Sequence, residues 1–328
     1  MIPHCLRPGA AKTDSDPFLL VLTLAAFLLG TVFVCDAFSQ DAPTCLGNDE
    51  NWVFCTGFEE GNLDLWDDYD GNPPETNTLV PHPGPFGREG NTVMRLRAPE
   101  GRGGADLVKV LPGTFDRLYA RWYVMWEPGY DFNAKGHGSG LFAGDRDLMG
   151  NSGYRPDGTN RFLASLEPHA TEHRLNFYAY YPGMYQDCVD PEGSCWGDSF
   201  PCLDDNGETF CTEPQHRPGP LPPVLETGRW YNVEMLMDGG TPSPDGSVAD
   251  GILDLWIDGM EYGPWDDLWY RSTSELKLSI LYLRLWHHGE HSVEGILLDE
   301  VAVSTERIGT ATVPAQAGSW GSVKGMYR

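Results

Sequence analysis

The chain has 328 residues and is strongly acidic, with 48 Asp and Glu against 22 Lys and Arg and a formal net charge of −26. This charge argues against nucleic-acid binding, because a protein that binds phosphates presents a positive surface. It also opposes the binding of a polyanion unless the few basic residues gather in one cleft.

The N-terminus has the pattern of a signal peptide. Arg7 and Lys12 precede an uncharged apolar run over residues 17–34 that ends near small residues. We predict that residues 1–39 are removed on export and that the protein is secreted, periplasmic or extracellular, with no membrane contact after cleavage. An uncleaved membrane anchor is the alternative, because the run approaches the roughly 20 residues that span a bilayer.

The rest of the chain has the length of one large β domain. Removing residues 1–39 from the 328 leaves 289 residues, which is ordinary for a large all-β sandwich. We predict a single domain over residues 40–309. Residues 310–328 are small and polar, and we expect them to form a flexible tail.

The cysteines fit an oxidising compartment. Six remain after export, and an even number in a secreted chain predicts disulfides. We expect Cys45 to pair with Cys55, because they are neighbours at the mature N-terminus. Three pairings are open to the other four cysteines, whose spacings lack the tight Cys-x-x-Cys of a zinc knuckle. These four are Cys188, Cys195, Cys202 and Cys211.

Short strands separated by turns account for most of the domain. Apolar and polar residues alternate, or aromatic residues cluster, in six runs, and Asp258-Gly259 is a strong hairpin signal. Many Gly and Pro residues punctuate these runs, which predicts a sandwich or jelly roll of two antiparallel sheets. The six runs cover residues 92–97, 118–124, 175–180, 230–237, 251–257 and 296–303.

One segment, residues 182–223, breaks this rhythm. It holds four cysteines and many Pro and Gly residues, with little periodicity. A long segment of this kind is usually functional or disordered, and cysteine cross-links argue against disorder. We predict a disulfide-rich insertion beside a cleft.

Several motifs resemble the jelly-roll polysaccharide lyases of the concanavalin-like superfamily, in particular the family 14 alginate and glucuronate lyases. The resemblance rests on residues 118–132, on Gly136-His137-Gly138-Ser139-Gly140-Leu141, and on residues 228–234 and 250–259. Residues 298–309 are similar to the closing strand of the glucuronan lyases and a related cellulose-induced fungal protein. The resemblance implies a concanavalin-like β-jelly roll. It implies activity less directly, since the superfamily also includes glucanases and binding modules.

The same resemblance implies a structural calcium ion. In the fungal relative, acidic residues of the first and last strands hold calcium, and this sequence has Glu59 and Asp299 at the matching places, with Asn91 nearby. A hard cation prefers such oxygen ligands from several segments. The alternative is that these side chains are solvated strand ends.

His137 is the candidate catalytic base. It falls where the alginate lyases carry a lysine, and the glucuronan lyases have a histidine near this point. A β-eliminating lyase must neutralise a uronate carboxylate, remove the adjacent proton and protonate the leaving oxygen. An imidazole can act as the base at neutral pH. Arg161 and Lys135 are the candidates to pair with the substrate carboxylate, and an idle turn histidine is the alternative to a base.

A tyrosine-rich strand supplies the candidate acid. The two-residue period places Asn176, Tyr178 and Tyr180 on one face, and the matching strand of the family 14 lyases carries a tyrosine pair that transfers protons. We predict Tyr178 or Tyr180 as the acid, with Asn176 and Arg121 binding substrate, and a tyrosine in place of His137 is the alternative base. A packed aromatic face is the alternative.

These features favour a secreted lyase that cleaves a uronate-containing polysaccharide by β-elimination. Its partner would be an acidic or neutral extracellular polysaccharide. A non-catalytic carbohydrate-binding or cell-surface module on the same fold is the alternative, favoured by the replaced lysine and the net acidity.

Overall fold

The computed structural model describes part of the chain: residue 45 and residues 50–69, 76–98, 100, 103–134, 136–184, 194–203, 220–289 and 294–310. The predicted signal peptide, residues 311–328 of the predicted tail and the candidate Lys135 lie outside these residues. All described residues belong to one compact unit, Asp41–Arg328. Within them, no helix has the length and apolar character needed to cross a membrane.

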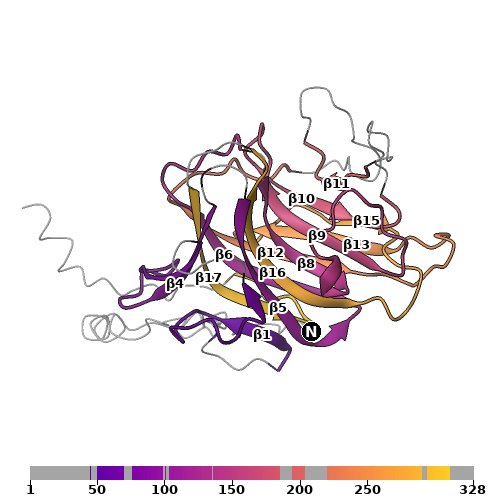
Figure 1. Ribbon diagram of the computed structural model, residues 1–328, viewed down its shortest axis with the longest axis horizontal. Coiled ribbons are helices and arrows are strands. Elements are labelled where there is room, and N and C mark those ends of the chain that lie inside the picture. Colours follow the sequence, from indigo (N-terminus) through magenta and orange to yellow (C-terminus); the bar gives the residue numbers. More distant parts are fainter. Residues whose placement is uncertain are drawn as a thin grey trace, which may run out of the picture. The chain divides into compact units, whose positions relative to one another are not determined.

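Two antiparallel sheets make up this unit, and Figure 1 shows β8, β9 and β10 side by side in one of them. The nine-stranded sheet runs in the order β14 (Met260–Glu261), β13 (Gly251–Ile257), β12 (Trp230–Asp238), β6 (Arg117–Trp126), β17 (Glu294–Ser304), β4 (Thr92–Ala98) and β3 (Asn77–Pro81), with β1 (Trp52–Thr56) on β17 and β15 (Trp265–Leu268) on β13. The eight-stranded sheet runs in the order β11 (Asp198–Phe200), β10 (Leu175–Tyr180), β9 (Arg161–Pro168), β8 (Ser139–Gly144), β16 (Leu278–His287), β5 (Gly103–Phe115) and β2 (Asp68–Tyr69), with β7 (Gly136–His137) on β16.

The predicted fold class is confirmed. Each of the six predicted runs lies in a strand, and the described residues contain only one helical turn, the 3₁₀ turn η1 (Arg146–Leu148). Strand alternation builds the core between the sheets. On β6, alternate residues face the core between the sheets, namely Leu118, Ala120, Trp122, Val124 and Trp126. Burying such side chains stabilises the fold by about 1.5–3 kcal/mol each.

The predicted disulfide between Cys45 and Cys55 is present and attaches the start of the domain to β1. Cys195 and Cys202 are also disulfide-bonded, which rules out the zinc alternative for these two thiols. Cys188 and Cys211 lie outside the described residues, so the pairing within this group of four stays open.

We expect replacement of Cys45 and Cys55 by serine to lower the free energy of unfolding by about 2–3 kcal/mol, because a cross-link that closes a short loop restricts the unfolded chain. The two cysteines are 10 positions apart in the sequence. Urea denaturation of the double variant and the wild type, both without reductant, measures the difference. An unchanged midpoint would contradict a stabilising role.

Candidate active site

A cleft of about 270 Å³ lies on the outer face of the eight-stranded sheet. On β16, Tyr282, Arg284 and Trp286 line it, while the alternate leucines pack in the core. Strands β9 and β10 add four side chains, and residues 149–152 after η1 close one end. The lining residues are Asp106, His137, Phe142, Met149, Gly150, Asn151, Ser152, Leu163, Ser165, Tyr178, Tyr180, Tyr282, Arg284, Trp286 and His288.

His137 is held in place from several sides. It pairs with Trp286 through the β7–β16 contact, and its ring lies between the Trp286 and Tyr178 rings, at centroid distances of 5.7 and 5.3 Å. Its Nδ1 lies 2.9 Å from Glu167 Oε2, and its Nε2 lies 2.8 Å from His288 Nε2. A carboxylate can only accept, so the His137 proton lies on Nδ1 and Nε2 carries the lone pair when the ring is neutral. When both rings are neutral, His288 donates its Nε2 proton to this lone pair, so His137 Nε2 can act as a base only after a ligand displaces that hydrogen bond.

The glycines around His137 allow the neighbouring strand to pack closely. A Cβ at Gly138 would collide with the Leu166 carbonyl, and one at Gly140 would collide with the Ala164 carbonyl. Both carbonyls belong to β9, which pairs with β8. The close approach of the neighbouring strand therefore requires glycine at both positions.

The two tyrosines of β10 both line the cleft, and their hydroxyls lie 3.2 Å apart. Tyr180 donates to the Cys195 carbonyl at 3.2 Å and accepts weakly from the Gly153 amide at 3.4 Å. Tyr178 accepts from the Gly197 amide at 3.0 Å. Because Tyr180 has its own acceptor, the Tyr178 proton is the one directed to Tyr180 or to a ligand.

The Tyr178 phenol keeps its proton in the folded protein. Burial, with the nearby Tyr180 hydroxyl, raises the pKa of Tyr178 above its ordinary value of 10.0. The phenol therefore stays protonated at neutral and moderately alkaline pH, as a general acid requires and as a general base does not. A phenol that keeps its proton fits the predicted role of Tyr178 as an acid better than that of a base.

Arg284 is a cleft residue that the sequence analysis missed. Its guanidinium donates to both Asp106 carboxylate oxygens, at 2.7 and 3.0 Å, and lies 5.3 Å from the Tyr282 ring centre. Its backbone amide donates to Ser139 Oγ at 3.1 Å. The signal that could have found it is the alternation of Tyr282, Arg284 and Trp286 along one strand face.

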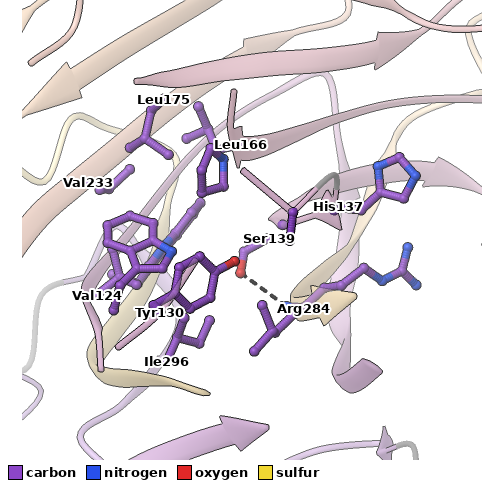
Figure 2. Close-up of a pocket in the computed structure, with 16 residues that line it drawn as sticks. Val124, Tyr130, His137, Ser139, Leu166, Leu175, Val233, Arg284 and Ile296 are labelled. Carbon is purple, nitrogen blue, oxygen red and sulfur yellow. Dashed lines mark hydrogen bonds between the residues drawn. The ribbon is translucent and has the colours of Figure 1, made fainter. Parts of the chain in front are cut away.

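A smaller cavity of about 30 Å³ lies behind the cleft, between the sheets. Figure 2 shows Val124, Tyr130 and Leu175 grouped on one side of it, with His137 and Arg284 on the other. His137 and Arg284 line both cavities, so they form part of the wall between the cleft and the core. The small cavity is apolar and has room for about one water molecule, so the cleft is the candidate site for a sugar.

Two other predicted residues lie near the cleft without lining it. Arg161 donates to the carbonyls of Leu148 and Tyr154, at 3.1 and 2.9 Å, and lies 5.7 Å from the Tyr180 ring centre. It therefore holds the loop that closes one end of the cleft. Asn176 is buried opposite Glu167 in the β9–β10 pair, on the Tyr178 face.

Arg121 lies in the other sheet. It is fully buried on β6, stacked against Trp52 and Tyr123, and its guanidinium donates to the Glu300 and Gly309 carbonyls at 3.4 Å. It does not line the cleft.

Glu59, Asn91 and Asp299 converge at one end of the nine-stranded sheet. Asn91 Nδ2 lies 3.1 Å from Asp299 Oδ2, and Glu59 Oε1 accepts from the Thr92 amide beside Asn91 at 3.3 Å. Burial, with the charges of Glu300 and Glu59, raises the pKa of the Asp299 carboxyl to about 7. A buried carboxylate near other acids fits a hard cation. No cluster of three His, Cys, Asp or Glu side chains in the described part of the chain is arranged to hold a metal, so amide or carbonyl oxygens would have to complete this site.

Comparison with solved structures places this arrangement in a known fold. The alginate lyase vAL-1 from Chlorella virus aligns with a TM-score of 0.55 at 14% identity, over 78% of this chain and 100% of that chain. The marine PL-14 alginate lyase from Aplysia kurodai aligns with a TM-score of 0.53 at 13% identity, over 78% of this chain and 99% of that chain. The chain has the jelly-roll fold of these alginate lyases. A mutant of the alginate lyase Aly36B in complex with alginate trisaccharide shares this lyase fold, with a TM-score of 0.51 at 14% identity over 78% of this chain and 97% of that chain.

The resemblance in the sequence is thus confirmed at the level of the lyase fold. No family model matches the sequence, and no curated protein matches it. What the lyase fold does in this chain depends on the residues of its own cleft.

Proposed function

We propose that this protein is a β-eliminating polysaccharide lyase that acts on a uronate-containing polysaccharide in the cleft of the eight-stranded sheet. The observation that carries the proposal is the contact of His137 with Tyr178, in which a base oriented by Glu167 stacks on a phenol that keeps its proton. Both side chains line one open cleft on a fold shared with alginate lyases.

The reaction divides the work between these two groups. His137 Nε2 takes the proton on the carbon next to the uronate carboxylate, and Tyr178 gives its proton to the glycosidic oxygen. The carbon–oxygen bond breaks as a carbon–carbon double bond forms in the new non-reducing end, and no water is consumed. After the reaction, His137 is a protonated imidazole and Tyr178 is a phenolate. Transfer of one proton from His137 to Tyr178 restores the resting state.

The cleft is poorly equipped to neutralise the substrate carboxylate, because acidic side chains offset its positive charges. Arg284 is charged but already paired with Asp106, and Glu167 places a second carboxylate beside His137. His288 adds a positive charge when it is protonated. This balance favours a sparsely charged polymer over a densely charged one, and it supports a non-catalytic carbohydrate-binding module as the second candidate function.

The test is incubation with alginate, glucuronan and related polymers while the ultraviolet absorbance of the unsaturated product is followed. The lyase proposal expects a steady rise with at least one polymer, and the rise should depend on His137. No rise with any uronate polymer, together with retention on a polysaccharide column, would favour the binding module.

We further propose that Glu59, Asn91 and Asp299 hold a structural calcium ion. Folding raises the pKa of the Asp299 carboxyl to about 7. In the absence of metal, this carboxyl therefore contributes most to folding stability below its ordinary pKa of 3.8. The contribution is lost as the pH rises through about 7. Calcium binds the ionised carboxylate, so we expect it to raise the melting temperature by several degrees near pH 8 and by little near pH 5.

The matched control is Asp254, another buried carboxyl on the nine-stranded sheet, whose pKa is raised by burial and by Glu261. Asp299→Asn should abolish the calcium response in thermal melting, whereas Asp254→Asn should keep it. An equal response in both variants would show that any bound calcium lies elsewhere.

A further inference from the structure

A rim built from two segments borders the cleft beside the tyrosine pair. Gly153 and Cys195 form an isolated antiparallel bridge, in which the Cys195 amide donates to the Gly153 carbonyl at 2.9 Å. Cys195 is also disulfide-bonded, and β11, three residues later, pairs with β10. The Gly153–Cys195 bridge and the β10–β11 pairing therefore hold this rim against the sheet.

Trp196 lies at the centre of the rim. The residue before it, Cys195, accepts the hydroxyl proton of Tyr180, and the residue after it, Gly197, donates its amide to the Tyr178 hydroxyl. The backbone on both sides of Trp196 is thus tied to the tyrosine pair that we propose for catalysis. Its indole is nevertheless 41% exposed.

Tyr154 is a second exposed aromatic on the adjacent segment. It follows the bridge residue Gly153 and is 67% exposed, and Ser152, two residues before it, lines the cleft. The Tyr154 carbonyl accepts from Arg161, so this segment is also anchored to β9. Two exposed aromatic side chains therefore belong to neighbouring segments beside the cleft, on backbone that is held in place.

Exposed aromatic rings beside a cleft suit a sugar. The axial C–H groups of a pyranose form an apolar face that packs on an indole or phenol, while the equatorial hydroxyls stay in water. Such contacts do not depend on charge. A protein with a net charge of −26 gains little from long-range attraction to a polyuronate, so uncharged stacking is a suitable source of affinity.

We propose that Trp196 and Tyr154 form an additional sugar-binding subsite, which stacks on a pyranose residue of the bound polysaccharide beyond the residues at the cleavage point. The subsite lies at the Tyr180 end of the cleft. It rests on the proposed function, because it takes the cleft to be where the polysaccharide binds.

The test compares Trp196→Ala, Tyr154→Ala and Trp196→Phe on a length series of oligouronates prepared from alginate and glucuronan. Tyr69→Ala is the matched control, because Tyr69 is 42% exposed at the opposite edge of the same sheet, on β2. If the subsite exists, Trp196→Ala should lower kcat/KM about tenfold on long oligomers, because KM rises. On the shortest cleaved oligomer, kcat/KM should change little. Trp196→Phe should recover part of the loss, and the control should show none.

Binding measurements separate this subsite from the lyase proposal. The same oligomers are titrated calorimetrically into His137→Ala protein, with and without Trp196→Ala. If the wild type cleaves no polymer but the tryptophan variant binds long oligomers about tenfold more weakly, the subsite stands and the lyase proposal falls. The opposite outcome is a wild type that cleaves the polymer and a Trp196→Ala variant whose kcat/KM is unchanged, or reduced equally, at every oligomer length. That outcome overturns the subsite and leaves the lyase proposal standing. A wild type that neither cleaves nor binds these oligomers overturns both.

Discussion

His137→Ala should reduce kcat/KM for the cleaved polymer by about 10²–10⁴-fold, the range expected when a positioned general base is removed. The loss should appear in kcat, because the imidazole acts on the reacting carbon. His137 is 24% exposed at the cleft surface, so the variant should fold normally. The measurement is the rate of formation of the unsaturated product at saturating and at limiting polymer.

Two further variants show whether the base works as described. Glu167→Gln keeps the size of the side chain but removes the carboxylate that holds Nδ1, so it should lower kcat by about 10–100-fold while substrate affinity changes little. His82→Ala, in the loop between β3 and β4 of the other sheet, serves as the control and should leave the rate unchanged. Full activity in His137→Ala would remove this residue as the base and leave the lyase proposal to be judged by product formation alone.

Tyr178→Phe should cost about 10²–10³-fold in kcat, because the glycosidic oxygen then leaves without a proton from the enzyme. Tyr180→Phe should cost less, since its hydroxyl proton is directed to the Cys195 carbonyl and its role is to position Tyr178. Each variant keeps the ring that packs on the sheet, and each loses a hydrogen bond worth about 1 kcal/mol of stability.

The pH profile gives an independent test of the tyrosine. Folding raises the pKa of Tyr178, so the protonated acid persists as the pH rises and its deprotonation should not limit kcat/KM below about pH 9. The profile is measured by initial rates in overlapping buffers. An alkaline decline with a midpoint below that range, present in the wild type and absent from Tyr178→Phe, would contradict this assignment.

Glu167, Arg284 and His288 distinguish the cleft from the site predicted by sequence resemblance. A lysine at position 137 would carry a permanent positive charge, whereas here a histidine is bonded to an acidic residue and faces a second histidine. Arg284 is likewise offset by Asp106. The cleft therefore depends on shape, aromatic contacts and the protonation of its histidines more than on fixed positive charge.

Local pattern in the sequence determined the fold class, the six strand runs, the Cys45–Cys55 pair and the shared face of Tyr178 and Tyr180. Strand periodicity, turn chemistry and short spacing are properties of neighbouring residues, so they can be read without the fold. The family motif then identified His137 as a residue of interest, although its immediate neighbours in the sequence do not distinguish a base from an idle turn histidine.

Only the tertiary structure decided which residues meet at the cleft. Glu167 on β9 contacts His137 on β7, which is 30 positions away in the sequence. Arg284 on β16 contacts Asp106 on β5, which is 178 positions away. Sheet register sets such contacts, and a shift of one residue would turn each side chain to the opposite face. Arg121 is kept from the cleft because β6 belongs to the other sheet, and the Gly153–Cys195 bridge holds the Trp196 segment near the tyrosine pair. The sequence by itself therefore determined the strands, whereas long-range strand pairing determined the site.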